Sequence, residues 1–256
     1  MAPFAVTAQQ RRIYVDPEDA RGHELIASEG DFNPGSLSLW RLALSARPWA
    51  LVVDVGVNYA EMLVGVNLPE GARVLGFEPN TSMHPFIRRT CTDNAIELDL
   101  RSEALSDRVG RSLLAVDMSW SGASKLTDSD PGDPRSVRCV EVDTTTLDDV
   151  VGTGIPWCAK VDVEGWEPRV LAGARRAMNA RTPWALMLEV LHLSPSYVAT
   201  LASEHVLLLL DRRTRRLVRV PGDNRSLAEQ MLSCGWLYPQ DCLLVSDDVA
   251  ESLAVR

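Results

Sequence analysis

Two short acidic motifs carry the residue types best suited to bind a nucleotide. Asp54, Gly56 and Asn58 follow one apolar run, and Glu78 with Pro79 follows the next. In a parallel α/β sheet, a strand, a tight turn and a helix N-terminus form such a site, and an acid at the tip of the next strand accepts hydrogen bonds from two ribose hydroxyls. The sequence therefore predicts a nucleotide-sized cofactor site over residues 52–80.

The composition of the first motif favours one cofactor over another. It contains one glycine, Gly56, and lacks the pattern G-x-G-x-x-G, and Asp54 precedes the turn. A pyrophosphate binds close to the backbone N–H groups of a helix N-terminus, and a carboxylate at that place would repel it. S-adenosylmethionine carries a sulfonium, an amino group and a ribose, and fits these residues better than NAD does. A nicotinamide-dependent oxidoreductase is the rival interpretation among enzymes.

A second concentrated motif spans residues 160–167. Lys160, Asp162 and Glu164 alternate with valines, so that a strand would project all three toward one face. Ligands in open parallel sheets bind outside the carboxyl ends of the strands. We therefore expect Asp162 and Glu164 to face the same crevice as the first motif. The alternative for Glu164 is a structural role near the start of the next helix, where a negative charge is favoured.

A third group of candidates follows the next apolar run. Glu189 ends that run and His192 comes three residues later. We expect Asp162 and Glu189 to orient a substrate hydroxyl and to hold Mg²⁺ between them; sharing a proton is the other arrangement open to two carboxylates. His192 is the candidate general base, with an ordinary loop histidine as the alternative.

A polar segment at residues 119–135 is longer than a structural connection needs, which is typical of lids and binding loops. Within it, residues 121–125 are hydroxyl-rich and are expected to close on cofactor or acceptor; a flexible turn is the plain alternative. Trp120 and Trp166 offer apolar faces to a sugar ring, although large aromatic side chains also serve as core.

Strand-like and helical runs alternate along the chain, which predicts a mainly parallel sheet with helices on both faces. The expected strands are residues 50–55, 73–77, 96–100, 112–116, 137–142, 157–163, 183–191, 206–211, 216–220 and 242–245. The expected helices are residues 36–47, 59–68, 81–91, 167–178, 194–203 and 226–234.

Composition limits the class of protein. The 256 residues suit one α/β domain, and a formal charge of −9 argues against binding to a nucleic-acid backbone. Neither a leader sequence nor a membrane-spanning run is found, so we expect a soluble, cytoplasmic protein. The five cysteines are scattered and are expected to be reduced. The arginines at residues 212–219 form either a solvated turn or an anion contact.

Together these motifs resemble the FkbM-type family of S-adenosylmethionine-dependent methyltransferases, in its branch that methylates hydroxyls of sugars and natural products. The resemblance covers roughly residues 50–192, and the matching segments are Asp54-x-Gly56-x-Asn58, Phe77-Glu78-Pro79-Asn80, Asn94, Ala104-Leu105-Ser106-Asp107, Thr146-Leu147-Asp148-Asp149, Lys160-x-Asp162-x-Glu164-Gly165 with Glu167, and Leu188-Glu189-Val190. It implies a Rossmann-like, class I methyltransferase fold: a doubly wound, mainly parallel seven-stranded sheet with a C-terminal antiparallel strand.

The resemblance also implies roles for individual residues. Asp54, Gly56 and Asn58 would surround the methionine portion of the cofactor and Glu78 would bind its ribose. The remaining cofactor contacts it implies are Pro79, Ser102, Glu103, Ala104, Leu105 and Asp162. The sequence departs from the family where Ala60 replaces a glycine and Glu61 replaces a neutral residue, so contacts at that turn are expected to differ.

The function expected from sequence is O-methylation of a saccharide or glycoside hydroxyl, as in polysaccharide biosynthesis, with Asp162, Glu164, Glu189 and His192 as the catalytic candidates. The alternatives are O-methylation of a polyketide-like natural product and cofactor binding without catalysis. The expected partner is a small-molecule or oligosaccharide acceptor, and a homodimer is compatible with the sequence. We expect one domain, with an N-terminal extension over residues 1–48, a cofactor-binding core over 49–192 and C-terminal elements over 193–256.

Overall fold

The structure is a computed structural model that describes residues 2–31, 33–129, 136–152, 154–233, 237 and 240–254. The last residues of the expected helix at 226–234 and of the polar segment at 119–135 lie outside these ranges, as does Cys234. The other four cysteines are free thiols, and three of them are buried, so the expectation of reduced cysteines is confirmed for this part of the chain.

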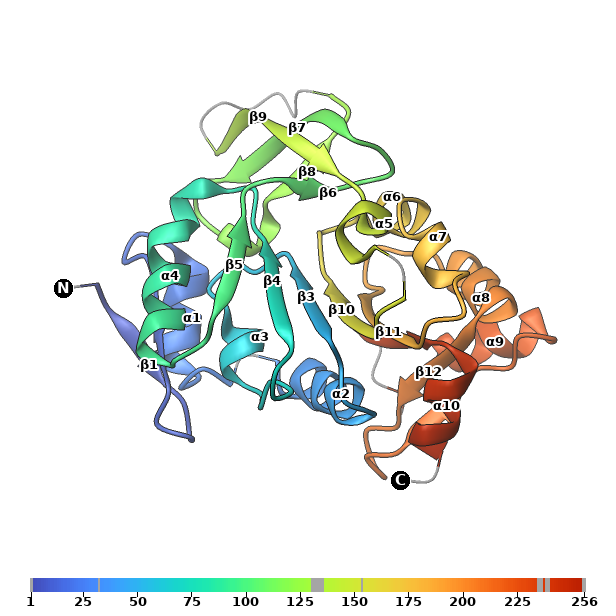
Figure 1. The fold of residues 1–256 in the computed structure, drawn as a ribbon. Helices are drawn as coiled ribbons and strands as arrows, with labels where there is room; N and C mark the ends of the chain where they lie inside the picture. The colour runs from blue at the N-terminus through green and yellow to red at the C-terminus, as the bar shows by residue number, and fades with distance from the viewer. Residues whose placement is uncertain are drawn as a thin grey trace.

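An eight-stranded sheet forms the centre of the protein, in the order β13-β12-β14-β11-β10-β3-β4-β5 (Figure 1). Its strands are β3 (Leu51–Val55), β4 (Arg73–Phe77), β5 (Leu98–Arg101), β10 (Trp157–Val161), β11 (Trp184–Glu189), β12 (Val206–Leu210), β13 (Leu217–Arg219) and β14 (Asp241–Val245). The strands from β5 to β11 are parallel, and β14 is antiparallel to β11 and β12. The predicted fold is confirmed, although the central sheet has eight strands rather than seven, because the strand expected at 216–220 forms its edge as β13.

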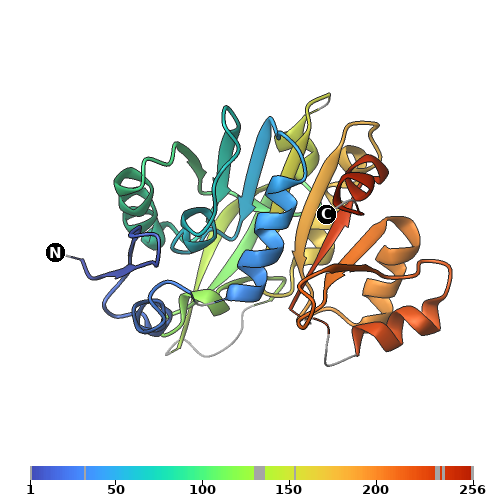
Figure 2. The same ribbon diagram turned by 90° about the horizontal axis from the view of Figure 1, so that it is seen from below.

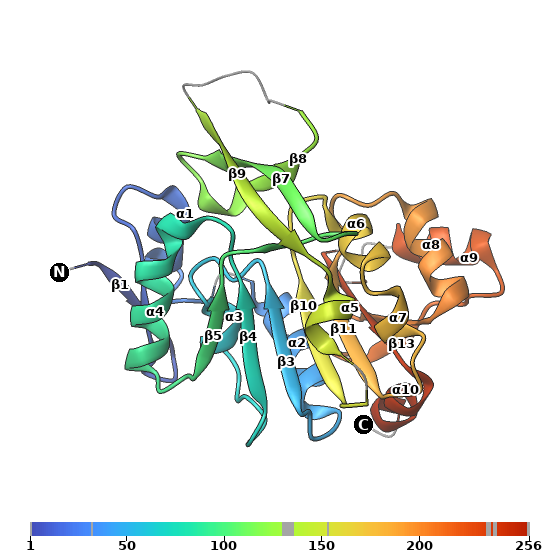
Figure 3. The same cartoon turned by 45° about the horizontal axis from the view of Figure 1, so that its top comes forward.

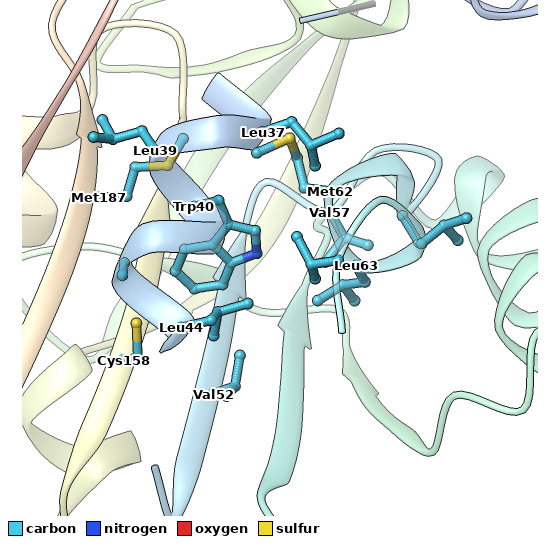
Figure 4. Packing of buried hydrophobic residues seen from close by; sticks show 14 of the residues in the cluster. Leu37, Leu39, Trp40, Leu44, Val52, Val57, Met62, Leu63, Cys158 and Met187 are labelled. Atoms are coloured by element: carbon cyan, nitrogen blue, oxygen red, sulfur yellow. The ribbon is translucent and has the colours of Figure 1, made fainter. Parts of the chain in front are cut away.

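Alternate residues of the central strands pack on opposite faces of the sheet and form two hydrophobic cores. Val52 and Cys158 belong to one core, and their neighbours Val53 and Ala159 to the other. Because both faces are covered, these strands are apolar throughout rather than alternating. Trp40 of helix α2 lies in the middle of the first core, where it is fully buried (Figure 4).

Helices cover both faces of the sheet. The first core is covered by α2 (Pro34–Ser45), α3 (Glu61–Val64), α4 (His84–Asp93), α10 (Asp247–Ala254) and α1 (Ala20–Ala27), and Figure 2 shows α2 crossing the sheet. The second core is covered by α5 (Leu147–Val151), α6 (Glu167–Ala172), α7 (Arg175–Met178), α8 (Pro195–Glu204) and α9 (Arg225–Leu232). The described residues include no helix long and apolar enough to cross a membrane.

Two expected helices differ from those observed. The helix expected at 59–68 is only α3, because Gly65 ends it and Arg11 takes the carbonyls of Val64 and Val66 at 2.6 Å each. The helix expected at 167–178 breaks into α6 and α7 at Gly173. There the carbonyl of Ser106 approaches so closely that a Cβ on Gly173 would lie 2.1 Å from it.

A four-stranded sheet, in the order β6-β9-β7-β8, stands over one end of the central sheet (Figures 1 and 3). Its strands are β6 (Ala104–Leu105), β7 (Gly110–Asp117), β8 (Lys125–Thr127) and β9 (Val137–Thr145), and a short 3-10 helix, η2 (Ser121–Ala123), precedes β8. A second 3-10 helix, η1 (Thr81–Met83), precedes α4. The two strands expected at 112–116 and 137–142 are confirmed and are longer than expected.

The N-terminal segment forms a hairpin of β1 (Phe4–Val6) and β2 (Arg12–Tyr14) and then α1. The hairpin packs beside α4 at the β5 side of the molecule, as Figure 1 shows. At the opposite side, the arginine-rich residues 212–216 connect β12 to β13 and are solvent-exposed. Arg215 donates a hydrogen bond to Ser38 there.

Candidate active site

A cleft lies where the central sheet reverses its winding, between β3 and β10. From β3 the chain continues to β4 and β5 on one side, and from β10 to β11 on the other, which makes this the usual ligand position of an open α/β sheet. The cleft holds about 690 Å³ of empty space, partly open to solvent. Its lining comprises Arg21, Val55, Gly56, Asn58, Phe77, Glu78, Pro79, Ala104, Leu105, Leu114, Ser121, Gly122, Ser124, Lys125, Leu126, Asp162, Val163, Glu164 and Trp166.

A buried lysine holds together the loops after the two central strands. Lys160 Nζ lies 3.4 Å from Asp54 Oδ1 and 3.4 Å from Asp162 Oδ2, and it donates a hydrogen bond to the carbonyl of Gly56 at 3.0 Å. Burial raises the pKa of Asp54 to about 6, and the charge of Lys160 opposes that rise. Burial alone would lower the pKa of Lys160, but Asp162, Asp54 and Glu61 outweigh it and raise that pKa.

Gly56 owes its identity to the packing of these two loops. Its φ is +80°, and a Cβ there would lie 2.0 Å from the carbonyl oxygen of Asp162. Only glycine adopts this conformation without strain and permits this approach. Asp54 itself does not line the cleft: it lies beneath the loop, 1 % exposed.

Glu78 follows β4 and faces the cleft with both carboxylate oxygens held. Oε2 accepts a hydrogen bond from the backbone N–H of Asn58, and Oε1 accepts one from the backbone N–H of Asn80, each at 2.9 Å. Burial raises the pKa of Glu78 to about 7, although the two backbone donors oppose the rise. Each oxygen keeps a lone pair, so the fixed carboxylate can accept two further hydrogen bonds from a ligand.

The N-terminal segment completes the wall of the cleft. Arg21, at the start of α1, donates from Nε to Asn58 Oδ1 at 3.1 Å and forms an ion pair with Glu61. Asp19 accepts a hydrogen bond from the backbone N–H of Ser121 at 3.0 Å. These contacts were not expected from the sequence, because no motif in residues 1–35 indicates which distant loop they meet.

The apolar part of the lining comes from the four-stranded sheet and from residues after β5. Leu114 and Leu126 face Ala104 and Leu105, and Trp166 closes this side with its Nε1 donating to Ser106 Oγ at 3.1 Å. Of the residues expected beside the adenine, Ser102 and Glu103 lie outside the lining. Four residues of the hydroxyl-rich segment 121–125 line the cleft, namely Ser121, Gly122, Ser124 and Lys125.

An acidic cluster lies at the β10–β11 end of the cleft. Glu164, with a φ of +56°, brings its Oε2 within 3.0 Å of His192 Nε2. Glu189 is 5 % exposed, and its Oε2 has no hydrogen-bond partner among the described residues. Burial, followed by the carboxylates of Asp162 and Glu164, raises the pKa of Glu189 to about 10.

The structure groups the candidate catalytic residues differently from the expected pair of Asp162 and Glu189. One ligand atom each of Glu164, Glu189 and His192 lies within 4.8 Å of the other two. Asp162 is close enough to influence Glu189, but its carboxylate is held by Lys160. His192 itself does not belong to the cleft lining, but its Nε2 lies 3.0 Å from Oε2 of Glu164, which does.

The doubly wound sheet and the cleft at its reversal point are those of a class I, S-adenosylmethionine-dependent methyltransferase. Residues 54–217 match the methyltransferase FkbM domain, and the chain therefore belongs to the FkbM methyltransferase family. None of the curated proteins matches the sequence.

Several solved methyltransferases are similar in structure. A precorrin-6y C5,15-methyltransferase from Geobacter metallireducens has 10 % identity and a TM-score of 0.42, with 96 % of this chain and 98 % of that chain covered. The O-methyltransferase TomG from Streptomyces achromogenes has 9 % identity and a TM-score of 0.40, over 91 % and 92 % of the two chains. A geranyl diphosphate methyltransferase has 13 % identity and a TM-score of 0.38, over 96 % and 97 %.

Proposed function

We propose that this methyltransferase transfers the methyl group of S-adenosylmethionine to a hydroxyl group of a saccharide or glycoside. The observation that carries the proposal is the cluster of Asp162, Glu164, Glu189 and His192 at one end of the cofactor cleft. Carboxylates accept hydrogen bonds from neighbouring hydroxyls of a polyol, and an imidazole beside a carboxylate is suited to accept a proton.

We place the cofactor in the rest of the cleft. The ribose hydroxyls would donate to the two free lone pairs of Glu78, and the adenine would lie against Leu105, Leu114 and Leu126. The amino group and sulfonium of the methionine portion would lie at the Asn58 and Asp162 side, where the nearby carboxylates favour positive charge.

Methyl transfer is a direct displacement at carbon. The acceptor oxygen forms a bond to the methyl carbon, the bond from that carbon to sulfur breaks, and its electron pair remains on sulfur to give neutral S-adenosylhomocysteine. A sugar hydroxyl must lose its proton as it attacks. Two activations are open to the cluster: His192 takes the proton while Glu164 holds its ring, or a cation held by the same side chains lowers the pKa of the hydroxyl.

The proposal is tested with purified protein, S-adenosylmethionine and a panel of monosaccharides, glycosides, oligosaccharides and phenolic polyketide-like acceptors. Formation of S-adenosylhomocysteine and of a monomethylated product in the saccharide arm is the expected result. Methylation of the phenolic acceptors alone would show that the acceptor is a polyketide-like natural product rather than a saccharide. Tight binding of S-adenosylhomocysteine without transfer to any acceptor would favour a cofactor-binding protein without catalysis.

A further inference from the structure

Three side chains meet where β10 and β11 end. Glu164 follows β10 in a left-handed turn, Glu189 is the last residue of β11, and His192 follows three residues later. Their ligand atoms lie within 4.8 Å of one another. For comparison, two ligands on opposite sides of an ion with 2.1 Å bonds are ~4.2 Å apart, so the side chains need to move little to share one ion.

Glu189 supplies an independent indication that something is bound here. The residue is 5 % exposed, and its Oε2 is buried and has no hydrogen-bond donor among the described residues. Buried carboxylates are almost always paired, because an unpaired one loses its hydration without compensation. One of its carboxylate oxygens lies within 4.8 Å of a ligand atom of Glu164 and of His192.

The charges that act on Glu189 are mainly negative. Besides burial, the groups that raise its pKa are the carboxylates of Asp162 and Glu164 in the loop after β10, of Glu167 in α6 and of Asp241 in β14. Among the described residues, Lys160 is paired with Asp54 and Asp162, and Arg21 with Glu61. Asp241 accepts a hydrogen bond from Ser36, and Oε1 of Glu167 accepts one from the N–H of Val163, while Oε2 of Glu167 is buried without a hydrogen-bond donor in the described part of the chain.

We propose that Glu164, Glu189 and His192 form a binding site for one divalent cation of the manganese or zinc type. One imidazole nitrogen with two carboxylates is a donor set that these ions accept, whereas Mg²⁺ prefers oxygen ligands alone and retains water. Three protein ligands leave coordination positions open for a substrate, as in catalytic metal sites. This site, formed by Glu164, Glu189 and His192, differs from the Asp162 and Glu189 pair expected from sequence.

The second part of the inference rests on the proposed function. Glu164 and Asp162 both line the cofactor cleft, so a cation held by Glu164 lies at its acceptor end. There it would make an acceptor hydroxyl more acidic. The hydroxyl proton passes to water at the open mouth, where the side chain of His192 is 44 % exposed. The oxygen then takes the methyl carbon, and the electron pair of the broken bond stays on sulfur.

The test begins with the full-length protein stripped by a chelator and titrated with Mn²⁺. Electron paramagnetic resonance measures free Mn²⁺, and calorimetry measures heat and stoichiometry. We expect one Mn²⁺ per chain, and at least tenfold weaker binding in Glu189→Gln and in His192→Gln, because each removes a direct ligand. Glu229→Gln is the matched control: it removes a carboxylate of α9 whose side chain is 40 % exposed, and this variant should bind Mn²⁺ like the original chain.

S-adenosylhomocysteine binding, measured on the same samples, separates this inference from the proposed function. Unchanged binding in both variants shows that the fold and the cofactor cleft are intact. Under that condition, absence of Mn²⁺ binding, or Mn²⁺ binding that neither variant weakens, overturns the site while the methyltransferase assignment stands. One Mn²⁺ per chain that both variants lose supports the site, even if no acceptor in the panel is methylated.

Activity provides the final discrimination once an acceptor is known. If the cation activates the hydroxyl, the stripped enzyme should lose at least tenfold in turnover and recover it with Mn²⁺. Full turnover by the stripped enzyme would overturn the catalytic role of the cation and leave His192, held by Glu164, as the base.

Discussion

The two ends of the cleft carry similar carboxylates that differ in the groups that neutralise or hold them. At the cofactor end, Asp54 and Asp162 share Lys160, and Glu78 accepts two backbone hydrogen bonds. At the acceptor end, Oε2 of Glu189 is buried without a hydrogen-bond donor among the described residues, and Oε2 of Glu164 lies 3.0 Å from Nε2 of His192. Pairing within the protein fixes the first set in one geometry. At the acceptor end, Glu164, Glu189 and His192 keep lone pairs that are free to bind a cation and a substrate.

The largest expected effect comes from breaking the pairing at the cofactor end. Lys160→Met leaves Asp54 and Asp162 without their shared cation inside the sheet. Removing one partner from a buried ion pair typically costs ~3–5 kcal/mol, and we expect a loss of that size in the free energy of unfolding, measured by urea denaturation.

The double variant Asp54→Asn with Lys160→Met serves as the control for this prediction. It removes the buried charge that the single variant leaves behind, so it should recover part of the lost stability. If the single variant is as stable as the original protein, the lysine contributes nothing to holding these loops together.

The next effect concerns the ribose contact and changes affinity rather than stability. Glu78→Gln keeps the size of the side chain but replaces one acceptor oxygen with an amide that faces a backbone N–H. A hydrogen bond to a charged group contributes about 1.5–3 kcal/mol, so S-adenosylhomocysteine should bind roughly 10- to 150-fold more weakly in calorimetry. Unchanged affinity would remove Glu78 from the cofactor site.

The pKa of Glu78, about 7, makes cofactor binding depend on pH. The carboxylate form accepts both ribose hydroxyls, so affinity for S-adenosylhomocysteine should rise as the pH increases through 7. The stability of the protein without cofactor has the opposite pH dependence. The folded pKa lies above the ordinary value of 4.5, so this group's contribution is fully present below about 4.5 and is lost as pH rises through 7.

Thermal shifts with and without S-adenosylhomocysteine, recorded from pH 5 to 9, test this dependence. Asp54, with a pKa of about 6, also titrates in this range. Glu78→Gln is therefore the necessary comparison, since the step near pH 7 should disappear in that variant. A step that persists there would belong to another group.

At the acceptor end the corresponding change should be harmless to the fold. Because the pKa of Glu189 is raised to about 10, the stripped protein carries a neutral carboxylic acid here at neutral pH. Glu189→Gln replaces this acid with a neutral amide of the same size and removes no hydrogen bond to Oε2 among the described residues. For chelator-stripped protein we expect the free energy of unfolding in urea denaturation to stay within about 1 kcal/mol of the original value. A loss above that size would mean that Glu189 is paired and would remove the contrast between the two ends.

The sequence predicted the sheet because its evidence is local. Apolar runs such as Leu51–Val55 and Trp157–Val161 form strands that other elements must cover on both faces of the sheet. The acidic residues that follow parallel strands must then lie at the same edge of the sheet. The contacts of Arg21 could not be predicted, since nothing in residues 1–35 specifies their distant partners. The grouping of Glu164 with His192 depends on a left-handed turn at Glu164 and Gly165, and only Gly165 indicates such a turn.

The smallest expected effect tests a departure from the family at the cofactor end. Ala60 adopts a φ of +64° at the start of α3 and is fully buried, in a conformation that favours glycine. Ala60→Gly relieves a backbone cost of about 1 kcal/mol and gives up a buried methyl worth about 0.8 kcal/mol. These terms nearly cancel, so urea denaturation should show a change below ~1 kcal/mol, whereas Gly56→Ala meets the Asp162 carbonyl and should be far more harmful. A large loss in Ala60→Gly would show that the methyl group packs in a way that makes alanine the better residue at this turn.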